Sequence, residues 1–180
     1  MAPINRRFFL LAPPAAAVAA ASWFSDPIDG LEALDVPPLA GAFHASGAPV
    51  KGFRFAQLEG SVTVIHALAS WRPECADEVA MWLELRGDPR FQIAGVFVRD
   101  SEAAARDFIA RVGNPYDALG FDPDGRVERQ LGVREAPSTV VLAPGRQIIH
   151  VARGPLTREH LKRTVLPIID GASPVTALMA

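Results

Sequence analysis

Two apolar, strand-like runs separated by a helix-like segment constrain the fold of this chain more than any other feature. Residues 61–68 (SVTVIHAL) are rich in β-branched side chains, and residues 91–98 (FQIAGVFV) form a second apolar run. Strands without polar alternation are typical of a sheet that helices cover on both faces. Between the two runs, residues 75–83 carry apolar side chains at helical spacing. A strand–helix–strand unit with a right-handed crossover therefore predicts an α/β fold.

Local signals at the helix ends extend this unit. Pro73 is suited to the first turn of the first helix, and Gly87 is suited to its end. Asp100 or Ser101 can cap a second helix that ends at Gly113. The apolar face of this second helix would consist of Ala105, Phe108, Ile109 and Val112.

The C-terminal third of the chain predicts a hairpin followed by a last helix. Residues 138–142 and 147–151 are short strands around an Ala-Pro-Gly-Arg turn. Thr157 can cap a helix that would bury three side chains along one side, namely Leu161, Val165 and Ile168. The predicted order is β-α-β-α-β-β-α, and a further strand pair would fit around residues 53–58.

Composition excludes several classes of function. The formal net charge of −2 argues against electrostatic binding of nucleic acid. A single cysteine excludes an intrachain disulfide framework and a metal site built from several thiolates. The four histidines show no ligand spacing, so we predict neither a metal site nor another cofactor; they are His44, His66, His150 and His160.

The first 24 residues predict export from the cytoplasm. Arg6-Arg7 precede an uncharged run that continues to Phe24 and includes Pro13-Pro14. A positive flank followed by an apolar run is typical of a signal peptide or an uncleaved membrane anchor. The paired arginines also resemble a twin-arginine export signal. Both alternatives place the remainder of the chain outside the cytoplasm, and a retained anchor would hold it at the inner membrane.

The pattern along the chain predicts four regions. Residues 1–24 are the signal peptide or anchor, and residues 25–50 form a linker that is rich in Pro, Gly and Ala and lacks periodicity. Residues 51–170 form the folded domain. Residues 171–180 are a small, apolar tail.

Six short motifs occur in the order and spacing of a known family. They are residues 69–75 (ASWRPEC), 113–116 (GNPY), 122–125 (DPDG), 131–133 (LGV), 136–139 (APST) and 154–157 (GPLT). Together they resemble the thioredoxin-like proteins of cytochrome c maturation, the CcmG/DsbE/TlpA group, and the CcmG/DsbE subgroup in particular. The resemblance implies a thioredoxin fold, in which helices flank a central mixed sheet.

The resemblance also places the family's active site at residues 71–75 and changes its chemistry. The family motif is Trp-Cys-x-x-Cys, and Arg72 stands here at the position of the attacking cysteine. Cys75 stands at the resolving position. Dithiol exchange needs one sulfur to attack and a second to resolve the mixed disulfide, so the resemblance implies a redox-impaired protein. Cys75 is then either a small buried hydrophobe or a lone thiol that forms single mixed disulfides.

A binding surface beside this motif follows from the same resemblance. Ala136 and Pro137 match the family's cis-proline loop, which offers its backbone to an extended peptide, and we expect their peptide bond to be cis. Trp71 and Pro73 would lie next to this loop. Trp71 either stacks on a substrate or is structural, and Glu78 is either a proton acceptor near Cys75 or a solvated carboxylate. His66, inside the first strand, is expected to be a hydrogen-bonded core histidine.

Two functions remain open at this point. The first is a periplasmic CcmG/DsbE-type protein of cytochrome c maturation, whose partner is apocytochrome c, another extended peptide or a membrane protein of that pathway. The second is a non-catalytic thioredoxin-fold module that binds a peptide or an assembly partner at the Pro137 loop. A one-cysteine peroxiredoxin fits less well. Such enzymes resemble a Pro-x-x-x-Thr-x-x-Cys pattern, and this chain lacks the threonine before Cys75.

Overall fold

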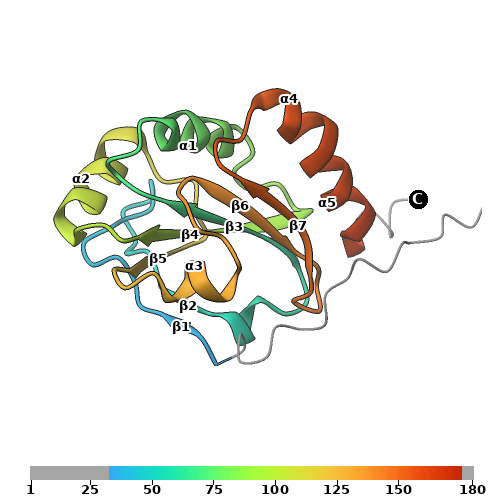
Figure 1. Cartoon of the computed structure of the whole chain (residues 1–180), viewed down its shortest axis with the longest axis horizontal. Helices are drawn as coiled ribbons and strands as arrows, with labels where there is room; N and C mark the ends of the chain where they lie inside the picture. Colours follow the sequence, from blue (N-terminus) through green and yellow to red (C-terminus); the bar gives the residue numbers. More distant parts are fainter. Residues whose placement is uncertain (1–32, 176–180) are drawn as a thin grey trace, which may run out of the picture.

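The computed structural model describes residues 33–175, which form a sheet with helices on both faces (Figure 1). The predicted signal or anchor segment, residues 1–24, lies outside the described residues, as do residues 176–180 of the predicted tail. The five-stranded sheet has the order β5-β4-β3-β6-β7. In that order the strands are Ala118–Asp122, Phe91–Val98, Val62–Leu68, Ser138–Leu142 and Ile148–Arg153. β3 runs parallel to β4 and antiparallel to β6, which confirms the predicted α/β fold with a mixed central sheet.

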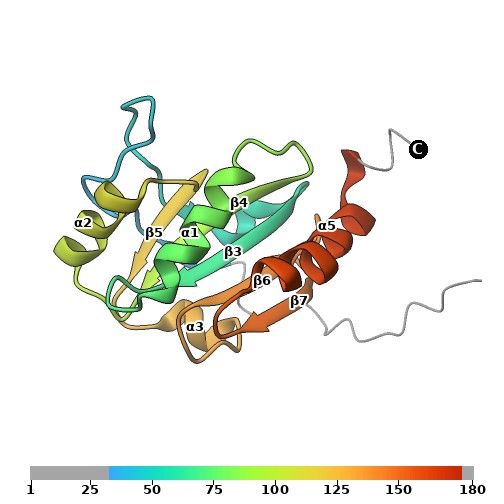
Figure 2. The ribbon, with the colours of Figure 1, turned by 90° about the horizontal axis from the view of Figure 1, so that it is seen from above.

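Separate apolar cores cover the two faces of the sheet. One core contains side chains of α1 (Glu74–Glu84), α2 (Glu102–Val112) and the C-terminal helix, which lie on the same side of the sheet (Figure 2). The other core contains side chains of α3 (Arg126–Gln130) and of the N-terminal part of the described chain. β3 and β4 lie between these two layers, and their predominantly apolar sequences fit this position.

The predicted cap of α2 is confirmed. The Ser101 hydroxyl accepts a hydrogen bond from the Ala104 N–H at 3.2 Å. The helix ends at Gly113, whose φ of 94° is disfavoured for residues with a Cβ atom. These two residues fix where β4 is followed by a helix and where the chain turns back toward β5.

The C-terminal helix differs from the prediction in which face it buries. It consists of α4 (Arg158–His160), the π-helical stretch η2 (Leu161–Val165) and α5 (Leu166–Ala172). Thr157 caps it as predicted, since its hydroxyl accepts from the His160 N–H at 3.1 Å. Ile169 is buried beside Leu161 and Val165, so the prediction of Ile168 was wrong. The π-helical turn is wider than an α-helical turn, so residues 161, 165 and 169 stay on one face. The last buried position therefore moves from residue 168 to residue 169.

Two regions of the fold differ from the sequence-based prediction. β5 and α3 follow α2 and were not predicted as a strand and a helix. The N-terminal strand pair is confirmed, but β2 (Phe53–Arg54) pairs with β1 (Asp35–Val36) and is followed by a 3₁₀ turn, η1 (Phe55–Leu58). β1 approaches β5 so closely that a Cβ atom at Gly120 would lie 2.2 Å from Val36 Cγ1.

The second half of the predicted linker contributes to the core. Between residues 33 and 50, five apolar side chains are buried: Leu34, Val36, Leu39, Ala42 and Val50. Leu39 N–H donates to the Leu119 carbonyl at 3.1 Å, so this segment is also bonded to the backbone of β5. No helix among residues 33–175 has the length and apolar character needed to cross a membrane.

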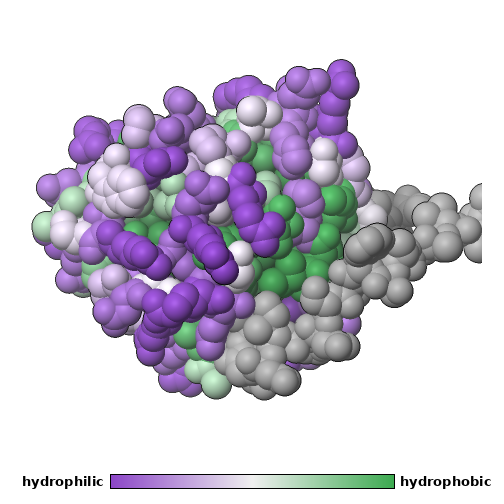
Figure 3. Space-filling model, in the orientation of Figure 1, coloured by the Kyte–Doolittle hydropathy of each residue, from purple (hydrophilic) through white to green (hydrophobic). Residues whose placement is uncertain are grey.

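The edge strand β7 is less well covered than the strands beside it. Its residues from Ile148 to Ala152 are half-buried, whereas all of β6 is buried. Figure 3 shows apolar surface in the region of β7, while polar side chains dominate most of the rest of that face. The register between β6 and β7 shifts at Val141 and Leu142, which marks a β-bulge in the predicted hairpin.

Candidate functional site

The predicted site residues lie where the central strand β3 passes into α1. The turn between them is closed by two backbone hydrogen bonds, from Arg72 N–H to the Ala69 carbonyl (3.2 Å) and from Cys75 N–H to the Arg72 carbonyl (3.1 Å). Trp71 is 61% exposed, and Pro73 is also exposed. Cys75 is fully buried in the first turn of the helix.

The loop that contains Pro137 reaches the same end of the sheet. Ser138 pairs with Ala67 in the antiparallel register of β6 and β3, so Pro137 lies one residue beyond that pair, at the end of β3. The Ala136–Pro137 peptide bond is cis, as expected, and both residues are buried. The structure therefore brings together two segments that are more than sixty residues apart in the sequence.

The surroundings of Cys75 stabilise the protonated form of its thiol. Burial raises the pKa of Cys75 to about 12, and the carboxylates of Glu78 and Glu74 add to this increase. A hydrogen bond from the Ala69 N–H to Sγ at 3.4 Å and the charge of Arg72 act in the opposite direction, but burial dominates. Because the thiolate is the nucleophile in disulfide exchange, this geometry favours the buried-hydrophobe interpretation of Cys75.

Arg72 places a guanidinium on the rim of the site. Its Nε atom lies 3.5 Å from a carboxylate oxygen of Glu74, and its Cζ atom lies 5.8 Å from the ring centroid of Trp71. The Arg72 side chain is 31% exposed. A cation and an indole therefore occupy the surface at which the family's attacking sulfur would lie.

Beneath α1, three polar side chains form a buried cluster. His66 Nδ1 lies 2.8 Å from the hydroxyl of Tyr116, and His66 Nε2 lies 3.2 Å from Glu78 Oε2. The other oxygen of Glu78 accepts a hydrogen bond from the Leu156 N–H at 2.7 Å. Glu78 is thus buried rather than solvated, and His66 is a bonded core histidine as expected. Burial also raises the pKa of Tyr116 well above its usual value, so its hydroxyl keeps its proton.

Sequence reasoning missed two residues of this region. Tyr116 belongs to the GNPY motif, but nothing in the motif shows that its hydroxyl reaches His66 on β3. Asp100 follows β4 and accepts a hydrogen bond from the Ser70 hydroxyl at 2.9 Å, which fixes the turn before Trp71. Its position at the carboxyl end of a strand next to β3 was the available signal.

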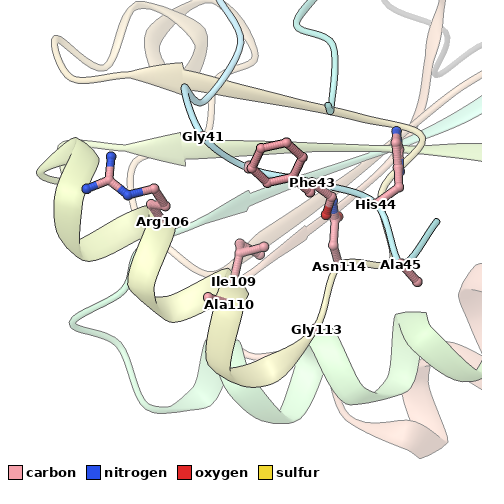
Figure 4. A pocket seen from close by; sticks show the side chains of 10 residues that line it. Gly41, Phe43, His44, Ala45, Arg106, Ile109, Ala110, Gly113 and Asn114 are labelled. Atoms are coloured by element: carbon pink, nitrogen blue, oxygen red, sulfur yellow. The ribbon is translucent and has the colours of Figure 1, made fainter. Parts of the chain in front are cut away.

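A separate pocket of about 270 Å³ lies between residues 41–45 and α2 (Figure 4). Phe43, which is 54% exposed, and Asn114 are among the residues that line it. Asn114 Nδ2 donates to the Phe43 carbonyl at 3.2 Å and holds this loop in place. None of the predicted site residues lines this pocket, so it is separate from the site at Trp71.

Comparisons with known proteins agree with this architecture. The chain is 30% identical over 141 residues to the thiol:disulfide interchange protein CycY of Rhizobium leguminosarum, covering 78% of this chain and 74% of that protein. It is 36% identical over 111 residues to a thiol:disulfide interchange protein DsbE homolog of Paracoccus denitrificans, covering 62% of this chain and 61% of that protein. No protein-family model matches the chain.

Solved structures show the same fold at lower identity. A secreted disulfide oxidoreductase of Mycobacterium tuberculosis, homologous to E. coli DsbE, matches with a TM-score of 0.61 and 20% identity, over 79% of this chain and 98% of that one. A putative thiol:disulfide interchange protein DsbE from Chlorobium tepidum matches with a TM-score of 0.59 and 20% identity, over 76% of this chain and 92% of that one. These matches confirm the thioredoxin fold.

Proposed function

Because the chain belongs to the family of DsbE- and CycY-type thiol:disulfide interchange proteins, we propose that it binds an extended segment of a partner protein without exchanging disulfides itself. Its place would be the maturation of c-type cytochromes, as its resemblance to the CcmG/DsbE subgroup implies. The proposal separates two properties that the family combines, namely recognition of a peptide and transfer of electrons to its cysteines.

The state of the two active-site positions carries the proposal. Dithiol exchange begins when a thiolate attacks a disulfide and ends when a second thiol resolves the mixed disulfide. Arg72 offers no sulfur at the first position, and the chain contains no other cysteine than Cys75. Cys75 is fully buried and has a pKa of about 12, so at neutral pH it is a protonated thiol without access to a partner.

The surface that would receive a peptide needs no sulfur. Trp71 is one of two large apolar side chains that are strongly exposed among residues 33–175. It lies next to the end of β3, where the Ala136–Pro137 segment also arrives. An extended chain can pair with such a loop through main-chain hydrogen bonds while an aromatic side chain packs on it.

The proposed partner is an apocytochrome c segment that contains Cys-x-x-Cys-His, or a membrane protein of the same pathway. The proposed location is the periplasm, either exported or anchored to the inner membrane by residues 1–24. A reporter enzyme that is active only outside the cytoplasm, fused after the last residue, tests the location. Reporter activity that requires Arg6 and Arg7 supports export, and absence of reporter activity from a fusion that is made in full contradicts it.

A reductase assay tests the loss of redox chemistry. In reduction of insulin or of a disulfide-bonded Cys-x-x-Cys-His peptide by dithiothreitol, the native protein should not exceed the uncatalysed rate. Arg72→Cys restores a sulfur at the first position and should accelerate reduction. Arg72→Ser is the matched control, since it removes the cation without adding a thiol. Turnover by the native protein at the rate of the Arg72→Cys variant would overturn the proposal.

A binding assay separates this function from that of a general peptide-binding module. Titration of the native protein with a peptide in which both cysteines of Cys-x-x-Cys-His are serine should quench the fluorescence of Trp71. A scrambled peptide of the same composition should bind more weakly. Equal affinity for both peptides would favour the second function, a non-catalytic module for other assembly partners.

A further inference from the structure

Two histidines meet outside the site at Trp71, where the edge strand β7 contacts the C-terminal helix. His150 belongs to β7 and His160 ends α4, and their Nε2 atoms are 3.4 Å apart. The ring centroids are 5.6 Å apart, and the ring planes are inclined by 30°. Since the nitrogens are closer than the ring centres, the rings converge through their Nε2 edges. Both rings are half-buried, so water can still reach them.

A backbone irregularity on each element accompanies this meeting. In the register of β6 and β7, Leu142 pairs with Ile148 and Val141 pairs with His150, which leaves Ile149 as an extra residue. The bulge places His150 opposite Val141, whose side chain belongs to the core under the C-terminal helix. On the helix, the π-helical stretch begins directly after His160. β-bulges and π-helical turns both occur preferentially next to functional sites.

The separation of the two nitrogens distinguishes two explanations of the contact. A direct hydrogen bond between the rings would be long, because protein hydrogen bonds have donor–acceptor distances of about 2.7–3.2 Å. Two imidazole nitrogens on one tetrahedral Zn²⁺, each about 2.0–2.1 Å from the ion, lie about 3.4 Å apart. The observed 3.4 Å matches the second arrangement.

We propose that His150 and His160 bind one divalent transition-metal ion through their Nε2 atoms. Imidazole ligands suit Zn²⁺, Cu²⁺ and Ni²⁺. Among residues 33–175, no group of three or more His, Cys, Asp or Glu side chains is arranged to hold a metal, so water would complete the coordination. The proposal departs from our sequence-based expectation of no metal site, because ten residues and a turn separate the two histidines along the chain.

The charges around the pair are compatible with a bound cation. Two guanidiniums of the C-terminal helix are engaged with carboxylates: Arg158 pairs with Glu84, and Arg163 lies 3.4 Å from Glu159. The ion would link the edge of the sheet to the last helix, independently of peptide binding at Trp71.

Calorimetric titration of the untagged protein with ZnCl₂ tests the site. The native protein should bind one Zn²⁺, and the variants His150→Ala and His160→Ala should each lower the affinity at least about tenfold. His44→Ala is the matched control, since it removes a histidine outside the pair and should leave the affinity unchanged. Absence of binding by the native protein at millimolar Zn²⁺, or equal affinity in both pair variants, overturns the proposal.

A thermal measurement keeps the test valid if an alanine variant folds poorly. An ion that binds only the native state raises the melting temperature with its concentration. Zn²⁺ should therefore raise the melting temperature of the native protein but not that of His160→Gln, a side chain of similar size that remains polar. Equal increases in both proteins would show that Zn²⁺ binds elsewhere and would overturn the proposal.

Discussion

The buried and the exposed halves of the candidate site differ in how far their side chains are packed and bonded. The buried half consists of Cys75, His66, Glu78 and Tyr116, which are packed and bonded beneath α1. On the exposed half, the guanidinium of Arg72 lies beside an exposed indole, at the position where the resemblance to the family motif predicts the attacking sulfur. The interior is constrained by the stability of the fold, whereas the rim can change without loss of structure. Substitutions inside should therefore alter stability, and substitutions on the rim should alter binding.

The largest effect is expected from Glu78→Ala. The change leaves the buried Leu156 N–H without its acceptor, and an unpaired buried donor costs about 1–3 kcal/mol in the free energy of unfolding, to which the lost packing beside His66 adds. Urea denaturation measures this loss. Glu74→Ala, on the same helix but only half-buried, should cost less than about 1 kcal/mol. Equal losses for the two variants would remove the distinction between interior and rim.

A smaller and pH-dependent effect is expected from Cys75→Ala. Removing the buried sulfur should cost about 1 kcal/mol at pH 7. Burial raises the pKa of Cys75 from 9.0 to about 12, so the native state holds a proton that the unfolded chain releases. The thiol's contribution is thus complete below pH 9 and is lost as the pH rises from 9 towards 12.

Urea denaturation of both proteins at pH 7 and pH 10 checks this prediction. The native protein should lose more stability between the two values than Cys75→Ala does, so the difference between them should shrink or reverse. A difference that is the same at both pH values would place the thiol in contact with solvent and move Cys75 to the exposed half of the site.

The smallest effect on stability is expected from Trp71→Ala. The side chain is exposed, so the free energy of unfolding should change by no more than about 0.5 kcal/mol. The affinity of the Trp71→Ala variant for the Cys-x-x-Cys-His peptide, measured by calorimetry, should nevertheless be clearly lower than that of the native protein. Phe43→Ala is the control, because Phe43 is similarly exposed but lines the separate pocket beside α2. A stability loss without a binding loss in Trp71→Ala would assign this indole to the fold.

The sequence predicted correctly those elements whose bounds are marked by the local pattern of apolar and turn-forming residues. β4 and β6 have the predicted bounds, because their runs are apolar and end at polar or turn residues. β5 was missed because it is short and contains Gly120, a weak strand former that fits only because Val36 packs against it. We predicted burial of residue 168 instead of residue 169 because no local sequence pattern indicates a π-helical turn.

The candidate site was predictable to a similar extent. Its position at the end of β3 followed from the motif around Trp71 and Cys75. The contacts of Tyr116 with His66 and of Asp100 with Ser70 did not, since the residues of each pair are thirty or more positions apart in the sequence. The convergence of His150 and His160 likewise depends on a bulge and a wide helical turn that the sequence does not reveal.

The burial of Leu34 in the core limits how far the domain can move from a membrane. If residues 1–24 remain as an anchor, roughly ten residues connect its end to Leu34, and a chain of that length spans at most about 35 Å. A connecting segment of this length would keep the domain, and Trp71 with it, close to the lipid surface. The protein would then meet its partners by lateral diffusion in the plane of the membrane. Those partners would be proteins that emerge from the same bilayer or bind to it.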